Sequence, residues 1–145
     1  MNTNSNNQAE NLAKPVLANR LFKLRAWEKE QNRMIKVFGF NEHLVFEQTW
    51  DSPSIKENIF EIEDCHIMQF TGLIDKKGTE IFEGDILKNP SEKKDIVIWF
   101  GNGFYGKSKH SHDKNRIISN PLCFDYLENK EIIGNIYENP DLLTN

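Results

Sequence analysis

Hydrophobic and polar residues alternate along much of the chain after residue 19, and a period of two predicts β-strands. In Arg20–Trp27, the residues Phe22, Leu24 and Ala26 fall on one side, as in a strand with one buried face. Met34–Phe40 shows the same alternation. The two segments therefore predict a β-hairpin.

Further strands are predicted where runs of Val, Ile and Phe lie between clusters of Gly, Pro and Asp. Asp75–Gly78 has Asp first and Gly fourth, as a type I turn favours, and predicts a hairpin turn. Ile96–Phe100 is an uninterrupted apolar run, which predicts a strand covered on both faces. The other predicted strands are His43–Thr49, Cys65–Thr71, Thr79–Phe82, Leu122–Leu127 and Glu131–Tyr137, and Pro140–Leu143 is predicted as a terminal turn or short helix.

No window of helical length carries a sustained apolar stripe with a period of 3.6 residues. The roughly eight to ten short strands predict an all-β (mainly β) protein, a small SH3-like barrel with an N-terminal β-hairpin extension. The 145-residue chain fits one domain, placed at residues 20–145. Residues 1–19 are rich in Asn and are predicted to be a disordered N-terminal tail, because they cannot bury enough apolar surface.

The distribution of charge narrows the classes of partner. With 18 Lys+Arg against 22 Asp+Glu, the net charge of -4 argues against an overall attraction to nucleic acid. The charge is segregated, since seven basic and two acidic residues give +5 over Lys14–Lys36, whereas one basic and seven acidic residues give -6 over Val37–His66. Such blocks pair across an interface or contact phosphates, unless they are solvated loops and strand faces.

A second basic stretch lies in the polar segment that follows Gly106. Its candidate nucleic-acid-binding residues are Lys107, Lys109, Lys114 and Arg116, which with Asp113 sum to +3. Near the N-terminus, Arg25 and Trp27 fall on the same side of their strand, which favours a cation–π contact over a binding platform.

The glycines of Gly101-x-Gly103-x-x-Gly106 match the spacing of the dinucleotide-binding fingerprint after a strand. The fingerprint requires a helix after its third glycine, and the following Lys107–Asn115 has no apolar stripe to form one. Asn102-Gly103 is instead the preferred pair for a two-residue type I′ turn. The sequence therefore predicts a hairpin here and no nucleotide site.

Metal binding would need several ligands that converge. His110 and His112 could share one strand face beside Asp113, but no partner is fixed by the sequence, so neither a metal nor another cofactor is predicted. Cys65, next to His66, and Cys123 lack a C-x-x-C spacing and are predicted to be free, mostly buried thiols.

Catalysis would need a nucleophile beside a base or a pair of carboxylates in separate environments. The chain has no G-x-S-x-G, H-E-x-x-H or P-loop string. Asp75, Glu80, Glu83 and Asp85 cluster in the sequence, but acidic residues are common in turns for backbone hydrogen bonding. No enzyme is predicted. Because no stretch approaches the ~20 apolar residues of a membrane span, the protein is expected to be soluble and cytoplasmic.

Three strings of the chain are similar to one known family. They are QFTGLIDKKGTEIFEGD at Gln69–Asp85, RAWE at Arg25–Glu28 with Met34 after the turn, and IGNIYENP at Ile133–Pro140. The chain thereby resembles the YopX family, small proteins found mostly in bacteriophages and prophages, over about residues 20 to 143. The departures are the N-terminal tail and the loop at residues 107–115. The resemblance implies a phage or prophage origin and a mostly β fold, and it supplies no catalytic residue.

These observations together predict a non-enzymatic accessory protein that binds another macromolecule and forms a homo-oligomer. The first alternative is a nucleic-acid-binding protein that uses the basic residues between 107 and 116. The second is a metal-dependent enzyme around His110, His112 and Asp113. The partner and the subunit number are not fixed by the sequence.

Overall fold

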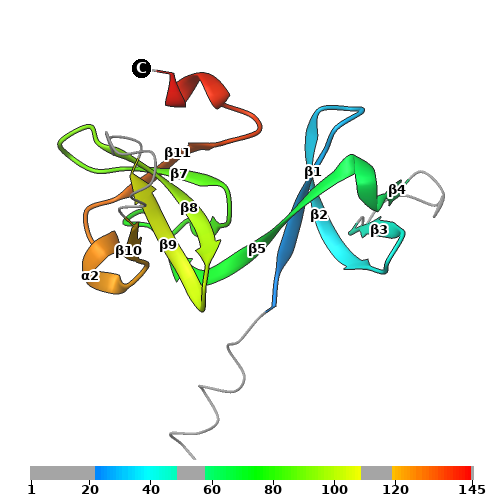
Figure 1. The fold of residues 1–145 in the computed structure, drawn as a ribbon, viewed down its shortest axis with the longest axis horizontal. Helices are drawn as coiled ribbons and strands as arrows, with labels where there is room; N and C mark the ends of the chain where they lie inside the picture. The colour runs from blue at the N-terminus through cyan, green and yellow to red at the C-terminus, as the bar shows by residue number, and fades with distance from the viewer. Residues whose placement is uncertain (1–21, 49–57, 109–118, 145) are drawn as a thin grey trace, which may run out of the picture.

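The computed structural model describes residues 22–48, 58–108 and 119–144, which form two antiparallel sheets (Figure 1). The predicted tail at residues 1–19 lies outside these ranges. The first sheet has the order β4-β3-β2-β1-β5-β6, and the second has the order β10-β9-β8-β7-β11. The mainly β class predicted from the sequence is confirmed, whereas the strand pairings of the described residues form two open sheets and no closed barrel.

The element bounds follow the chain order. The first sheet contains β1 (Leu24–Glu28), β2 (Arg33–Phe40), β3 (Leu44–Glu47), β4 (Ile59–Glu61), β5 (Cys65–Ile74) and β6 (Glu80–Phe82), with a 3-10 helix η2 (Ile62–Asp64) before β5. The second contains β7 (Asp85–Lys88), β8 (Lys94–Phe100), β9 (Gly103–Ser108), β10 (Ser119–Pro121) and β11 (Glu131–Asn135), with a helix α2 (Phe124–Leu127) before β11. The terminal 3-10 helix η3 (Pro140–Leu143) confirms the predicted turn or short helix.

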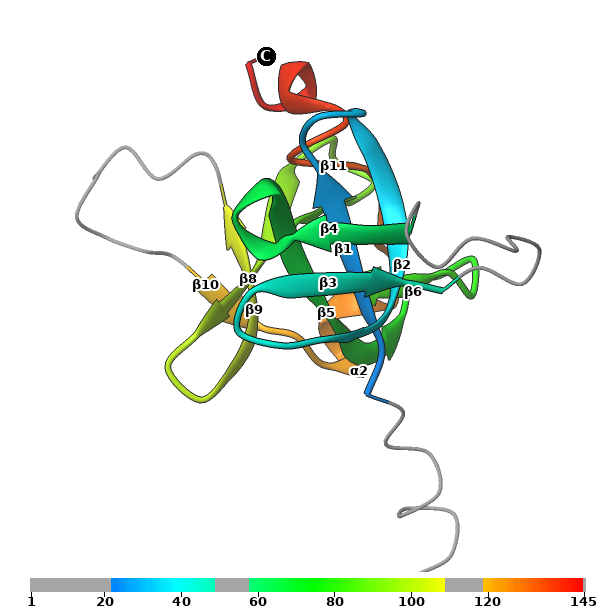
Figure 2. The ribbon, with the colours of Figure 1, turned by 90° about the vertical axis from the view of Figure 1, so that its right-hand side faces the viewer.

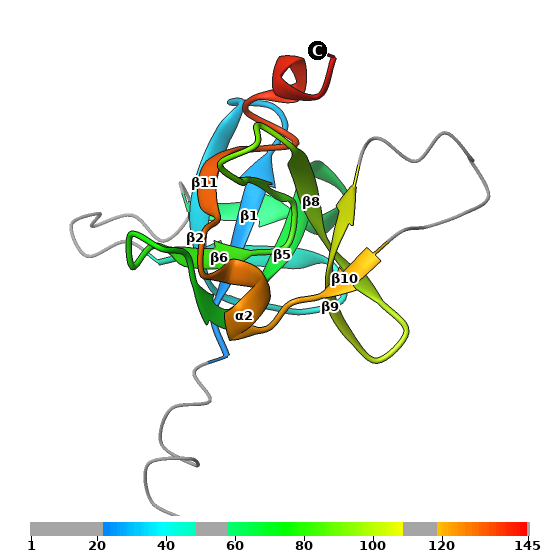
Figure 3. The same cartoon turned by 90° about the vertical axis from the view of Figure 1, so that its left-hand side faces the viewer.

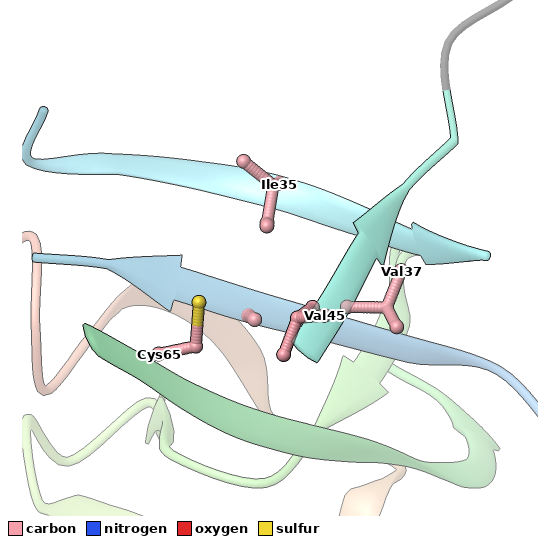
Figure 4. Close-up of a cluster of buried hydrophobic side chains, with 5 residues drawn as sticks. Ile35, Val37, Val45 and Cys65 are labelled. Carbon is pink, nitrogen blue, oxygen red and sulfur yellow. The ribbon is translucent and has the colours of Figure 1, made fainter. Parts of the chain in front are cut away.

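The predicted N-terminal hairpin is present as β1 and β2, which pair from Leu24 opposite Val37 to Glu28 opposite Arg33. The strongly bent first sheet brings β3 across β1 and β5 (Figures 2 and 4). The cluster enclosed in this way consists of Ala26, Ile35, Val37, Val45 and Cys65. Phe22 does not join it, because the strand begins only at Leu24, and Phe22 is 68% exposed.

The second sheet has its own core of Ile81, Leu87, Val97 and Leu127. The last of these comes from α2, which packs against this cluster (Figure 3). The prediction of a strand over Leu122–Leu127 was therefore wrong. One helical turn buries Leu127 and leaves Phe124 77% exposed. A strand would also have placed these two positions on opposite faces, so their burial pattern alone does not distinguish the two structures. The helical turn leads the chain into β11.

The turn between β5 and β6 confirms the prediction for Asp75–Gly78. The Gly78 N–H donates to the Asp75 carbonyl at 2.9 Å, and Gly78 has the positive φ of 83° that glycine adopts without strain. The Asp75 carboxylate also accepts hydrogen bonds from the backbone N–H groups of Lys77, Thr79 and Ile132. One side chain thus fixes the turn and joins it to β11.

Two predictions for the β8–β9 hairpin need correction. Phe100 pairs with Gly103, so the two turn residues are Gly101 and Asn102 rather than Asn102-Gly103. Gly101 has a φ of 61°, and glycine at the first central position is typical of a type II′ turn. Ile96–Phe100 is not covered on both faces, because Trp99 and Phe100 are each 51% exposed where the hairpin extends beyond the core.

The two thiols differ in environment. Cys65 is buried in the first core as predicted, and burial, followed by the nearby Glu28 carboxylate, raises its pKa. Cys123 is exposed at the N-terminal end of α2, so the prediction of mostly buried thiols holds for only one of them. In the part of the chain that the structure describes, no helix is long and apolar enough to cross a membrane.

Candidate binding groove

A buried ion pair fastens the two sheets to each other. Arg25 of β1 binds the carboxylate of Asp85 at the start of β7, and the side chain of Asp85 is only 1% exposed. Asp85 also accepts the backbone N–H of Phe82 at 2.8 Å, and the Arg25 guanidinium lies 4.7 Å from the Phe82 ring centroid. The cation–π contact predicted from Arg25 and Trp27 therefore has another partner, since Arg25 lies over Phe82 while Trp27 lies beside Tyr137. Burial raises the pKa of Asp85, although Arg25 opposes this shift.

Stacked rings join the first sheet to the C-terminal segment. The Tyr137 ring stacks on His66 with centroids 4.7 Å apart, and Trp27 lies 6.4 Å from Tyr137 in a nearly parallel orientation. Burial, and to a lesser degree Lys29, lowers the pKa of His66. Together with the Arg25–Asp85 pair, these contacts bring together residues from all three strings that carry the family resemblance. In this structure those residues hold the two sheets together.

A groove of about 630 Å³ lies on the outer face of β1 and β2, which is the side of these strands that points away from the first core. Its floor is the outer face of β1 and β2, and its wall is β6. Apolar side chains at the groove include Phe22 and Phe38, which are 68% and 81% exposed, and the half-buried Met34 and Phe82. The polar residues that line it are Lys23, Arg25, Lys36, Gln48 and Glu80.

The charges in this groove do not balance. Arg25 and Lys36 lie directly opposite each other on β1 and β2, a cross-strand pair of like charges that is unfavourable. Asp85 neutralises Arg25, and Glu80 forms an ion pair with Lys23. Lys36 is exposed and forms no ion pair with any residue in the described ranges. Within the part of the chain that the structure describes, the groove therefore has one cation without a counter-charge, Lys36, beside exposed phenylalanine rings.

A buried polar cluster lies in the second sheet, away from the groove. The Asp95 carboxylate accepts hydrogen bonds from Lys130 and from the Tyr126 hydroxyl, both at 2.6 Å. Burial, followed by the hydrogen bond to Asp95, raises the pKa of Tyr126. Gly106 of β9 lies against this ring, because a Cβ at that position would come within 2.8 Å of Tyr126 Cζ. Each charged group has a partner, so the cluster is satisfied without a ligand.

The structure places only some of the residues singled out in the sequence. Lys107 is exposed on β9, whereas Lys109, Lys114 and Arg116 lie outside the described residues, as do His110, His112 and Asp113. Among the described residues, no three His, Cys, Asp or Glu side chains converge to hold a metal ion.

Three of the four clustered acidic residues make structural contacts of their own. Asp75 accepts the hydrogen bonds of its turn, Glu80 pairs with Lys23, and Asp85 pairs with Arg25. Burial acts to raise the pKa of Asp75, but hydrogen bonds from the backbone of Ile132, Thr79 and Lys77 outweigh it, and the pKa is lowered.

The groove was missed by the sequence reasoning. One signal was available in β2, where Phe38 lies on the same side of the strand as Lys36, opposite to the buried Ile35 and Val37. A bulky apolar residue on the exposed side of a half-buried strand indicates a surface that something else covers. The contribution of β6 could not be seen, because it depends on the pairing of strands distant in the sequence.

The comparisons with known proteins agree with this architecture. A family model described as YopX protein matches residues 23–144. The chain belongs to the YopX family. Among solved structures, this YopX protein is similar to the crystal structure of protein EF1440 from Enterococcus faecalis, with 25% sequence identity and a TM-score of 0.59. The similarity covers 85% of this chain and 98% of that chain. No curated protein matches the sequence.

Proposed function

We propose that this YopX protein is a non-enzymatic accessory protein of a phage or prophage, and that it binds a partner macromolecule in the groove of β1, β2 and β6. The observation that carries the proposal is the pair of exposed rings, Phe22 and Phe38, beside the uncompensated Lys36. An exposed apolar patch with a polar rim is typical of interaction sites. Membership of the family supports the origin, and the likeness to EF1440 supports the fold.

We further propose that the second sheet with α2 is a small SH3-like module. The first sheet is then the N-terminal extension that carries the groove. A homo-oligomer would be compatible with this arrangement if the oligomer interface left the groove free. Light scattering on the purified chain measures the subunit number directly.

The alternative function is nucleic-acid binding through the basic stretch that begins at Lys107. The exposure of Lys107 on β9 is the observation that favours it. Gel shifts across a salt series would test it, because phosphate contacts weaken steeply as the ionic strength rises. A flat response to salt, or no shift at all, would remove this alternative.

A matched pair of variants tests the proposed function in cells that produce the protein. Phe38→Ala removes a ring from the groove, whereas Phe40→Ala removes an exposed ring of the same strand that does not line it. Immobilised wild-type protein and Phe40→Ala should retain the same partner, and Phe38→Ala should lose it. Equal recovery with all three baits would contradict the proposal.

Turnover in a broad hydrolase and transferase screen, lost with one carboxylate variant that still folds, would contradict the non-enzymatic assignment.

A further inference from the structure

We propose that the occupant of the groove is an acidic peptide segment of a partner protein, in which a bulky apolar side chain stands beside one or two carboxylates. This inference rests on the proposed function, since it names the chemistry of the partner that the groove would hold. Two independent properties of the groove, its apolar surface and its charge, lead to it.

The apolar surface favours a side chain over a purely ionic ligand. Phe22 and Phe38 are the two most exposed rings in the groove, and Met34 and Phe82 add further apolar surface to its lining. An aliphatic or aromatic side chain laid across these groups would remove apolar surface from water on both partners. A small anion alone would leave the rings exposed.

The charge favours a carboxylate next to that side chain. The cross-strand pair of Arg25 and Lys36 is unfavourable, and Asp85 compensates only Arg25. A partner carboxylate above Lys36 would supply the missing counter-charge. Because Lys36 is exposed, such a pair would contribute more to specificity and to the rate of association than to affinity.

A peptide fits these charges better than a nucleic acid does. A groove that binds a nucleic-acid backbone uses several free cations along its length. Lys23 and Arg25 already have the carboxylates of Glu80 and Asp85 as partners. The net charge of -4 repels any anionic partner, but it opposes a nucleic acid, charged at every phosphate, more than a peptide with one or two carboxylates.

The experiment uses the full chain and a displayed library of random peptides. After selection, fluorescein-labelled copies of the enriched peptides are titrated with the protein, and binding is followed by fluorescence anisotropy. Enriched peptides should carry Asp or Glu beside an aromatic or aliphatic residue. Phe38→Ala should weaken their binding by about tenfold or more, while its control Phe40→Ala should change it by less than about twofold.

A charge reversal tests the carboxylate contact. Lys36→Glu should weaken the same peptides by about tenfold at low salt and by less at high salt. The control Lys93→Glu, an exposed position just before β8 that does not line the groove, should leave the binding within about twofold of wild type. Circular dichroism should show that each variant keeps the β fold, because all four side chains are exposed.

The outcomes separate this inference from the proposed function. Peptides that lose binding with Phe38→Ala but lack acidic residues, or that bind Lys36→Glu like wild type, would overturn the acidic chemistry and leave the groove as the binding site. Peptides insensitive to Phe38→Ala would overturn both. Two other results would overturn the peptide as the occupant. One is a labelled oligothymidine that binds more tightly than any peptide and loses this binding with Phe38→Ala. The other is self-association in sedimentation that Phe38→Ala abolishes.

Discussion

The buried Arg25–Asp85 ion pair makes a strong prediction about stability. Asp85→Ala leaves a largely buried guanidinium without its counter-charge and the Phe82 N–H without its acceptor. Removing one partner of a buried pair costs about 3–5 kcal/mol, a large part of the roughly 5–15 kcal/mol that stabilises a domain. Asp85→Asn keeps an acceptor for Phe82 and should cost less, about 1–3 kcal/mol.

Urea unfolding followed by tryptophan fluorescence measures these costs. With a denaturant slope of about 2 kcal/mol/M, the midpoint for Asp85→Ala should fall by roughly 1.5–2.5 M. The control is Glu92→Gln, which breaks the surface pair with Lys88, where the Glu92 side chain is 74% exposed. That change should cost less than about 1 kcal/mol. If Asp85→Ala shifted the midpoint no more than Glu92→Gln does, the idea that this pair fastens the two sheets would be refuted.

Three further predictions concern single positions. Gly106→Ala should destabilise the fold by about 1–3 kcal/mol in urea unfolding, since its Cβ would overlap a hydrogen-bonded tyrosine. The control Gly39→Ala, with nothing within 4 Å of an added Cβ, should change the stability by less than about 0.5 kcal/mol, and equal effects of the two variants would contradict this reasoning. The pKa of Asp75 is lowered in the folded protein, so its carboxylate stabilises the fold above the unfolded-state pKa, and this contribution is lost as the pH falls through the folded-state pKa. The difference in unfolding free energy between wild type and Asp75→Asn should therefore narrow on acidification, and a difference that widened would contradict this prediction. A thiol reagent should label Cys123 quickly in the native protein and Cys65 only after unfolding, and rapid labelling of both would show that the first core is wrongly described.

Local patterns were sufficient to predict the first hairpin and the turn at Asp75–Gly78. Both depend on residues close in the sequence, namely the alternation around Ala26 and Ile35 and the Asp and Gly of the turn. The same reasoning failed for Leu122–Leu127, because a short apolar run does not distinguish a strand from a single helical turn packed on a core. Whether the strands close into a barrel could not be predicted either, since closure depends on which edge strands pair, and the described strands form two open sheets.

The groove could not be predicted, because its parts come from strands that are distant in the chain. Lys23 and Glu80, which both line it, are 57 residues apart, and β6 becomes a wall only when it pairs with β5. The alternation did place Phe38 and Lys36 on the same side of β2, but it could not tell which rings the second sheet would cover. Arg25 and Trp27 became inter-sheet contacts, which left the β2 side of the face uncovered.

Chemical-shift mapping on the full chain tests the central claim, that the outer face of β1 and β2 is the binding surface. An isotope-labelled sample is titrated with the tightest peptide from the selection, and the amide shifts are followed residue by residue. The largest changes should fall within 22–25, 34–38 and 80–82, and they should disappear in Phe38→Ala. Changes centred on the β8–β9 hairpin at 99–105, with residues 34–38 unaffected, would contradict the account.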